Sequence, residues 1–391
     1  MTTTDSDPTV TATPPPTIPV MRPALGPEEA QAAAEAVASG WVAQGPRVAR
    51  FEEAFADTVD AAIGVATSSC TTALHLALVL LGVGPGDEVI VPSLSFIATA
   101  NVVRYVGATP VFADVDRATL GLTRETVAAA MTRATRAVIV VHQCGTPADL
   151  AGIHALCDER EIGVVEDAAC AVGATYRGEA IGSHSDLVAF SFHPRKVITT
   201  GEGGMLVTSR ADWGTRARRL REHGMSVSAA ERHASRGPIL EQYLEAGFNY
   251  RMTDIQAAVG LVQLGRLHDI VARRRQLGAR YRRLLTPISG TEMIQDPPDA
   301  TTNFQSFWLL MPESFPVGRD ELLAQLGEVG ISARRGIMAA HLEPAYAGHP
   351  CAPLPVTDFV TRRSLILPLF HDMTDDDQDR VVSALLDAAG V

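Results

Sequence analysis

Short apolar runs alternate with amphipathic stretches from residue 63 to residue 208, and this alternation constrains the fold more than any other feature of the sequence. The apolar runs predict strands at 63–67, 88–91, 110–112, 137–141, 163–166, 186–192 and 204–208. The stretches between them predict helices at 72–81, 97–106, 124–132 and 149–160. Strands that alternate with helices favour an α/β fold with a doubly wound, mostly parallel sheet. Such sheets bind their ligands at the carboxyl ends of the strands.

The chain is expected to divide into a leader and two domains. Residues 1–20 are rich in Thr and Pro, and we expect a disordered leader because they bury too little apolar surface to offset their ordering entropy. Residues 21–252 are expected to form a large α/β domain, which opens with helical spacing over 27–58. Residues 253–391 are expected to form a smaller C-terminal α+β domain.

The C-terminal part has helical patterns at 253–267, 271–285 and 375–389 and a strand pattern at 305–310. Its second helical pattern carries a dense arginine face, which we expect to be solvated or part of an interface. This face comprises Arg273, Arg274, Arg275, Arg280, Arg282 and Arg283.

Composition excludes several classes of protein. Lys and Arg total 33 against 45 Asp and Glu, and the resulting net charge of −12 argues against a nucleic-acid-binding protein. No run of apolar residues is long enough to span a membrane, and the N-terminus lacks the layout of a signal peptide. The five cysteines are scattered without a C-x-x-C pair, so we expect reduced thiols in a cytoplasmic protein and no metal site.

Lys196 is the first candidate for chemistry. It follows an apolar strand that contains Ser191, and it precedes the glycine-rich turn 199–204, which can bring backbone close to a ligand. A lysine desolvated there would have a lowered pKa and act as a nucleophilic amine, whereas the alternative is an ordinary surface lysine. The turn lacks the Lys-Ser/Thr ending of a P-loop, which excludes nucleoside triphosphate binding.

Three further groups of residues follow predicted strands. Glu166 and Asp167 end one strand, and only one of the two side chains can face a site there, either pairing with a protonated ring nitrogen or capping the next helix. Thr71 and Thr72 open a helix whose free N–H groups suit a phosphate, or they belong to an ordinary helix cap. Phe96 either stacks on a flat ring or packs in the core.

A lysine, a carboxylate, a phosphate cradle and an aromatic side chain at the same sheet edge are the parts that pyridoxal 5′-phosphate requires. The sequence resembles the DegT/DnrJ/EryC1/StrS family of sugar aminotransferases, which are PLP-dependent enzymes of fold type I. The resemblance runs from about Met21 to the C-terminus and includes the segments just described. It also includes residues 39–46, 51–52, 86–90, 107–112, 249–258 and 367–370. For the fold, it implies a large domain with a mostly parallel seven-stranded sheet and a smaller C-terminal domain.

The resemblance also implies a role for each matching residue of the cofactor site. Lys196 matches the lysine that forms the Schiff base and carries the proton between the cofactor and the substrate carbon. Asp167, and not Glu166, matches the partner of the pyridine nitrogen. The remaining matches are Thr71, Thr72 and Ser191 at the phosphate and Phe96 against the ring.

Other matching positions imply a partner subunit and a substrate side. Asn249 matches an asparagine that reaches the phosphate of the neighbouring subunit's cofactor, which implies a homodimer with shared sites. His341, Tyr250 and Arg251 are the candidates for the substrate side, although His341 is equally well explained as a surface or core histidine. Cys170, which we count with the cofactor site, stands where many members have Gln or His.

Within the family, the lysine at position 196 favours transamination over the branch that has histidine there and acts as a dehydratase. Residues 252–261 resemble the branch that aminates C4 of a 4-keto-6-deoxy nucleotide sugar. The expected mechanism is ping-pong with L-glutamate as the donor. Two alternatives stay open: an aminotransferase acting on a cyclitol or another natural-product ketone, and a non-catalytic regulatory relative.

Overall fold

A computed structural model describes residues 16–227, 237 and 240–391 of the chain. Residues 1–15 of the predicted leader lie outside the described residues. The leader was expected to extend to residue 20, but Ile18 is buried and pairs through a parallel bridge with Ile331 of the C-terminal domain. Ile18, within the predicted leader, is therefore part of the fold.

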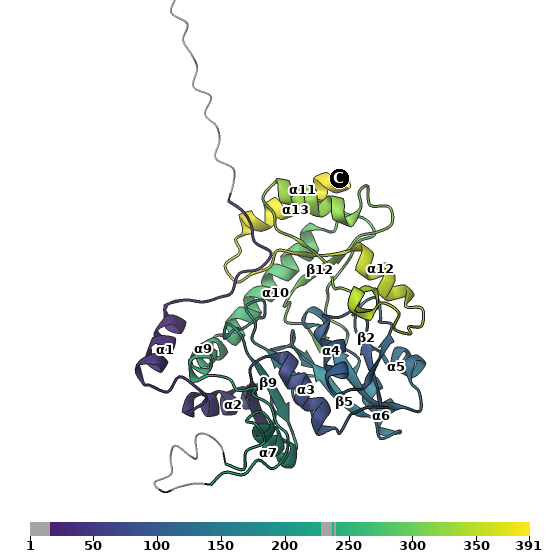
Figure 1. Cartoon of the computed structure of the whole chain (residues 1–391). Coiled ribbons are helices and arrows are strands. Elements are labelled where there is room, and N and C mark those ends of the chain that lie inside the picture. Colours follow the sequence, from purple (N-terminus) through teal and green to yellow (C-terminus); the bar gives the residue numbers. More distant parts are fainter. Residues whose placement is uncertain (1–15, 228–236, 238–239) are drawn as a thin grey trace, which may run out of the picture.

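A seven-stranded sheet forms the centre of the large domain (Figure 1). The strands lie in the order β1 (Ile63–Thr67), β9 (Gly204–Thr208), β8 (Val188–Ser191), β5 (Gly163–Asp167), β4 (Thr135–Val141), β2 (Glu88–Pro92) and β3 (Thr109–Ala113). Strand β9 runs antiparallel to both of its neighbours, and the other neighbouring strands pair in parallel. The predicted mostly parallel α/β sheet is confirmed.

Helices cover both faces of this sheet. One face packs against α2 (Pro46–Thr58), α5 (Arg124–Ala130) and α6 (Leu150–Asp158), and the other packs against α3 (Cys70–Leu80), α4 (Ala98–Tyr105) and α7 (Ala211–Leu220). Successive residues of a strand alternate between the two apolar clusters: Val138 and Val140 face the first, and Ala137 and Ile139 face the second. Because both faces are buried, the strands appear in the sequence as continuous apolar runs.

The helical spacing predicted over 27–58 corresponds to two helices, α1 (Pro27–Ala38) and α2. Gly45 ends the break between them, and a Cβ there would lie 2.9 Å from Asp254 Oδ2. The buried carboxylate of Asp254 accepts hydrogen bonds from the backbone N–H groups of Arg47, at 3.1 Å, and Val48, at 3.0 Å. An anion at this position satisfies the N–H groups that begin α2, and it ties that helix to α9 (Asp254–Gly265).

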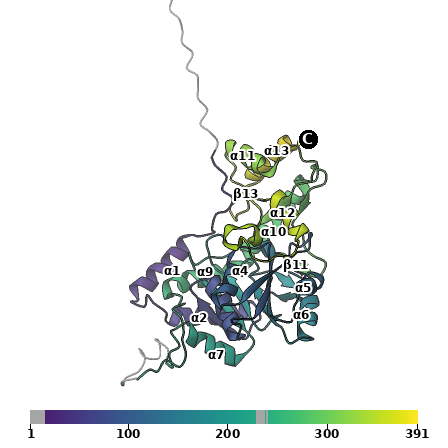
Figure 2. The same cartoon turned by 45° about the vertical axis from the view of Figure 1, so that its right-hand side comes forward.

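The C-terminal domain contains an antiparallel four-stranded sheet with helices packed around it. The strands lie in the order β10 (Glu292–Met293), β12 (Phe307–Leu310), β14 (Ser364–Leu367) and β13 (Arg334–Arg335). The helices are α10 (Leu267–Leu284), α11 (Arg319–Glu328), α12 (Pro355–Arg363) and α13 (Asp375–Ala389). Figure 2 shows α11 and α13 grouped at the end of the molecule opposite α7, with α12 closer to the large domain. Among the described helices, none is long and apolar enough to cross a membrane.

The division between the two cores falls later than the predicted boundary between residues 252 and 253. Ala257, Leu267 and Ile270 pack in the core of the large domain. Leu277 and Tyr281, further along α10, pack in the core of the C-terminal domain. Helix α10 therefore belongs to both domains and connects them (Figure 1). A sequence pattern marks where a helix starts, but it does not show which core a helix enters.

The arginine face on α10 is only partly a surface, which corrects the expectation for Arg274. The Arg274 side chain is buried, and its Nη1 donates to the carbonyl oxygens of Phe304, Gln305 and Leu369 at 3.1–3.4 Å. Burial lowers the pKa of Arg274 to about 10. Arg273 donates to the Met373 carbonyl at 2.7 Å. Helical spacing did not reveal these contacts, because the carbonyl groups come from loops far along the chain.

Candidate active site

The candidate site lies at the carboxyl ends of the parallel strands, where the predicted residues converge. Asp167 is the last residue of β5, and Lys196 lies in the loop that follows β8. Phe96 lies between β2 and α4, and Thr71 lies in the first turn of α3, which follows β1. This is the edge at which doubly wound sheets bind ligands.

The two acids at the end of β5 point in opposite directions. Asp167 Oδ2 accepts a hydrogen bond from Thr99 Oγ1 at 2.9 Å, and Asp167 Oδ1 accepts one from the Ala169 N–H at 3.2 Å. Glu166 Oε2 lies 2.8 Å from His142 Nε2 in a fully buried pair. Asp167 is thus the acid that shares surroundings with Lys196. Thr99, which holds its carboxylate, was not identified from the sequence.

Lys196 Nζ donates to Cys170 Sγ at 3.2 Å. Burial opposes the charge of this ammonium, but Cys170, Asp167 and Cys70 favour it, and the pKa of Lys196 is raised overall. The sequence-based expectation of a lowered pKa is therefore wrong for the polypeptide itself, because it rests on burial without the neighbouring thiols and carboxylate.

Lys196 is also the only lysine in the sequence, and the other residues in the count of Lys and Arg are all arginines. That count is a signal in the sequence that points to a specific need for an amine here.

The start of α3 provides the candidate phosphate cradle. Ser69 caps the helix: its Oγ accepts from the Thr72 N–H at 3.2 Å, and its N–H donates to Thr72 Oγ1 at 3.1 Å. No acceptor lies within reach of the Thr71 N–H in the part of the chain that the structure describes. Gly204 packs so closely here that a Cβ would lie 2.5 Å from Cys70 N. The glycine that ends this turn therefore lets β9 approach the start of α3 closely, and the contact of the turn with a ligand stays a prediction.

Ser191, Phe96 and Asn249 differ in exposure. Ser191 is buried at the end of β8, and its Oγ accepts from the His193 N–H at 3.4 Å. Phe96 is 69% exposed, although its carbonyl is fixed by the Thr99 N–H at 3.1 Å. Asn249 is exposed, and its backbone forms an antiparallel bridge with Glu222. The phosphate and ring-stacking roles of these residues stay predictions.

The three substrate-side candidates have different surroundings. His341 Nδ1 forms a hydrogen bond of 2.6 Å with Ser93 Oγ, and its Nε2 lies 3.2 Å from Asp358 Oδ1, which accepts no hydrogen bond from the described residues. Tyr250 Oη lies 2.9 Å from His75 Nδ1. Arg251 is half-buried and has neither an ion pair nor a hydrogen bond to any described residue. Arg251 is thus the candidate that is available to bind an anion.

Two residues of the C-terminal domain reach the site and were missed from the sequence. The buried Asn303 donates through Nδ2 to the carbonyl oxygens of Cys170 and Val172, both at 2.8 Å. Gln305 donates through Nε2 to the carbonyl of Arg195 at 2.7 Å. Polar residues at alternating positions just before an apolar strand were the available signal.

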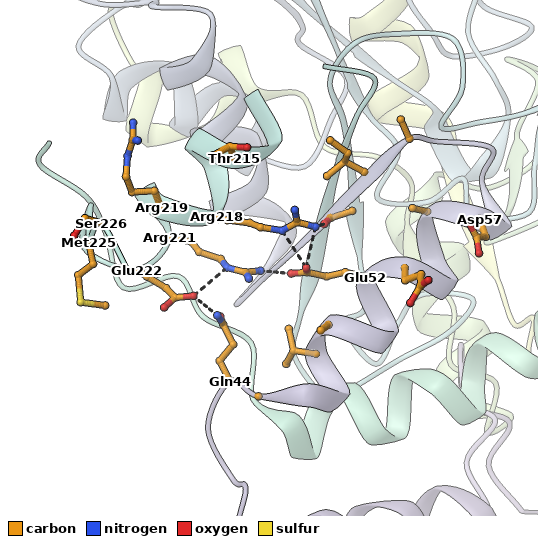
Figure 3. Close-up of a pocket in the computed structure, with 18 of the residues that line it drawn as sticks. Gln44, Glu52, Asp57, Thr215, Arg218, Arg219, Arg221, Glu222, Met225 and Ser226 are labelled. Carbon is orange, nitrogen blue, oxygen red and sulfur yellow. Dashed lines mark hydrogen bonds and ion pairs between the residues drawn. The ribbon is translucent and has the colours of Figure 1, made fainter. Parts of the chain in front are cut away.

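A cavity of about 780 Å³ lies elsewhere, between α2 and α7 (Figure 3). Glu52 pairs there with Arg218 and Arg221, and Glu222 receives a hydrogen bond from Gln44. None of the predicted cofactor residues lines this cavity. Its charges are largely paired with one another, so we do not identify it as the reaction site.

The residues at the strand ends fit pyridoxal 5′-phosphate. The Lys196 amine matches the aldehyde of this cofactor, and the Asp167 carboxylate, held by Thr99, matches its ring nitrogen. The start of α3, where the Thr71 N–H has no acceptor among the described residues, matches its phosphate. With the doubly wound sheet, this arrangement is the one expected of PLP-dependent enzymes of fold type I.

The chain belongs to the DegT/DnrJ/EryC1/StrS aminotransferase family, whose model matches residues 23–386. It is therefore a PLP-dependent aminotransferase. The aminotransferase TlmJ from Streptoalloteichus hindustanus is 36% identical, with a TM-score of 0.88 over 95% of this chain and 99% of that one. S. venezuelae DesV is 34% identical, with a TM-score of 0.88 over 96% and 100%. Spr1654 from Streptococcus pneumoniae, assigned as a sugar aminotransferase and solved in a PLP form, is 25% identical, with a TM-score of 0.89 over 96% and 99%.

Proposed function

We propose that this aminotransferase moves an amino group from L-glutamate to a keto carbon of a nucleotide-linked deoxysugar, at C4 of a 4-keto-6-deoxy sugar. The observation that carries the proposal is the convergence of Lys196 and Asp167 at the carboxyl edge of the sheet. The similarity to a relative assigned as a sugar aminotransferase supports a sugar as the acceptor. The choice of C4 rests on the resemblance of residues 252–261 to the C4-aminating branch.

Each residue of the site has a proposed task. Lys196 attaches the cofactor and later carries the proton to or from the substrate carbon. Asp167 holds the proton on the ring nitrogen, and the bound ring then supplies an electron sink. The Thr71 N–H and the Ser191 hydroxyl hold the phosphate, together with Thr72, and Phe96 covers the ring. Transfer occurs in two halves, first from the amino donor and then to the keto sugar.

We propose Arg251 as a ligand of the substrate diphosphate. A half-buried guanidinium without a described partner is suited to bidentate phosphate binding. Three arginines on α10 are already engaged: Arg273 and Arg274 contact backbone carbonyls, and Arg275 pairs with Asp296 at 2.9 Å.

We also propose a homodimer in which Asn249 reaches the partner's cofactor phosphate. Asn249 is exposed on its own subunit, and three large apolar residues that precede it in the chain are exposed as well. Those residues are Leu240, Tyr243 and Leu244. A two-fold interface would cover them and would place each Asn249 at the other subunit's site. A cytoplasmic location is part of the proposal and is supported by five free cysteines.

An absorbance spectrum with added pyridoxal 5′-phosphate, before and after L-glutamate, tests the proposal in wild type and Lys196→Ala. We expect the wild type to show a visible cofactor band that glutamate removes, and Lys196→Ala to lack this cycle. Keto acceptors are then compared, because a preference for a cyclitol over nucleotide-linked 4-keto sugars would overturn the acceptor. A wild type that acquires no band would instead support the regulatory alternative.

A further inference from the structure

The contact between Lys196 and Cys170 involves the only amine side chain of the protein. Lys196 Nζ lies 3.2 Å from Cys170 Sγ, within the range of a hydrogen bond to sulfur. Lys196 has no further hydrogen-bond acceptor for its Nζ among the residues in the described ranges. The thiol therefore determines where the amine lies.

The backbone that carries Cys170 is fixed from the C-terminal domain. Asn303 Nδ2 donates to the carbonyl oxygens of Cys170 and Val172, both at 2.8 Å. Asn303 is fully buried, and Gly145 leaves the space for it, because a Cβ on Gly145 would lie 1.8 Å from Asn303 Oδ1. The position of Cys170 thus depends on packing that tolerates little movement.

The segment before Lys196 is fixed by the same part of the C-terminal domain. Gln305 Nε2 donates to the carbonyl of Arg195 at 2.7 Å, and the Gln305 N–H donates to Asn303 Oδ1 at 2.8 Å. Asn303 and Gln305, which are hydrogen-bonded to each other, therefore fix the backbone at Cys170 and the backbone next to Lys196 together. These hydrogen bonds fix the backbone at both positions, from which the two side chains extend to their contact of 3.2 Å.

We propose that Cys170 is a positioning residue whose sulfur accepts a hydrogen bond from the Lys196 ammonium, keeping this amine protonated and in place until it reacts with the cofactor. The inference rests on the proposed role of Lys196. Before the amine can attack the aldehyde of the cofactor, it must lose a proton and leave the sulfur. Cys170 therefore slows cofactor capture at neutral pH and raises the pH at which capture becomes fast.

Other titratable groups also face Lys196. Asp167 and Cys70 favour its charge along with Cys170, and the ammonium also acts on Cys144 and His193. The side chains of Asp167, Cys70, Cys144 and His193 all remain in a Cys170 variant. Because Cys170 also raises the pKa of Cys70 and of Cys144, the Lys196 titration reports the loss of the sulfur contact together with these smaller effects.

The single lysine allows a direct test on the cofactor-free protein. Labelling with [ε-¹³C]lysine gives one side-chain signal, whose pH titration reports the Lys196 amine over the range in which circular dichroism shows a folded chain. The variants are Cys170→Ala, Cys170→Ser and, as a matched control, Cys351→Ala, which removes an exposed thiol. In parallel, borohydride-trapped capture of pyridoxal 5′-phosphate is followed at pH 7 to 9.

We expect the midpoint of the signal to fall by about one pH unit in Cys170→Ala, a change of about tenfold in amine basicity. Capture at pH 7 should then be faster by about the same factor, Cys170→Ser should lie between the two proteins, and Cys351→Ala should match the wild type. Equal midpoints in wild type and Cys170→Ala would overturn the inference. If the wild type captures no cofactor at all, the proposed role of Lys196 falls, while the labelled signal still decides whether Cys170 holds the amine.

Discussion

Glu166 and Asp167 are adjacent in the sequence, yet their carboxylates belong to different environments. The Glu166 carboxylate is paired with His142 in the core, and the Asp167 carboxylate is held by Thr99 at the active site. The backbone joins the two environments, because the His142 N–H donates to the Asp167 carbonyl at 3.2 Å. A strand that places successive side chains on opposite faces thus gives one acid a structural role and the other a proposed catalytic role.

Thr99→Val should weaken catalysis. The substitution removes the hydroxyl that donates to Asp167 Oδ2 and keeps the shape of the side chain. A hydrogen bond to a charged group contributes about 1.5–3 kcal/mol, so we expect kcat/KM to fall roughly ten- to a hundredfold. Thr99→Ser, which keeps the hydroxyl, is the control in steady-state assays. Equal kcat/KM in wild type and Thr99→Val would contradict this role for Thr99.

The Glu166–His142 pair should make folding stability depend on pH in the acid range. Although burial opposes its charge, hydrogen bonding and the charge of His142 lower the pKa of Glu166 in the folded chain. The contribution of Glu166 to the free energy of unfolding is therefore complete above its unfolded pKa of about 4.3. This contribution is lost as the pH falls through the lower pKa of the folded chain.

Urea unfolding of wild type and Glu166→Gln at pH 7 and at several values below 4.3 measures this contribution. We expect the wild type to be the more stable at pH 7 and the difference to shrink as the solution becomes more acid. A difference that stays constant with pH would show that the carboxylate charge does not matter to folding.

Arg274→Met should destabilise the C-terminal domain. The substitution keeps most of the buried stem but leaves three carbonyl oxygens without their donor. We expect a loss of about 2–4 kcal/mol in the free energy of unfolding, measured by denaturant titration. Arg283→Met, on the exposed side of the same helix, should change it by less than about 0.5 kcal/mol. A loss as small for Arg274→Met as for Arg283→Met would restore the expectation that Arg274 is solvated.

Arg251→Ala should separate the two half-reactions. If Arg251 binds the substrate diphosphate, the KM for the keto sugar should rise by about tenfold, the effect of one charge-assisted contact. The first half-reaction with L-glutamate should be unchanged in single-turnover spectra. Arg282→Ala, an exposed arginine on α10, is the control. An equal loss in both halves would place Arg251 at the cofactor or in the fold.

Mixed dimers test the shared site. Suppose that each site uses Lys196 of one subunit and Asn249 of the other. A dimer of one Asn249→Ala subunit and one Lys196→Ala subunit then has one site in which both residues are intact and one site in which both are replaced. Random mixing then gives about a quarter of the wild-type activity, more than either parent alone. Activity no higher than the average of the two parents would show that Asn249 acts within its own subunit or not at the site.

Local patterns in the sequence were enough for the strands of the large sheet and for α3 to α6, but they did not predict α7. Each predicted strand from 63 to 208 matches an observed strand to within two residues at either end. Parallel strands buried on both faces are continuous apolar runs, so a short window of sequence contains the information. The break between α1 and α2 was missed, because it depends on a carboxylate of α9 that follows more than 200 residues later.

The sequence by itself determined the class of fold, the family and the edge of the sheet where chemistry is expected, because alternation and motifs are local and repeat along the chain. Only the tertiary structure decided that Thr99 holds the Asp167 carboxylate, that the pKa of Lys196 is raised and that Arg274 is internal. Each of these depends on groups that are brought together from distant segments, such as Cys170 beside Lys196 and the Phe304 carbonyl beside Arg274. The pKa and the burial of a side chain depend on all the groups around it in space, and a single stretch of sequence does not contain those groups.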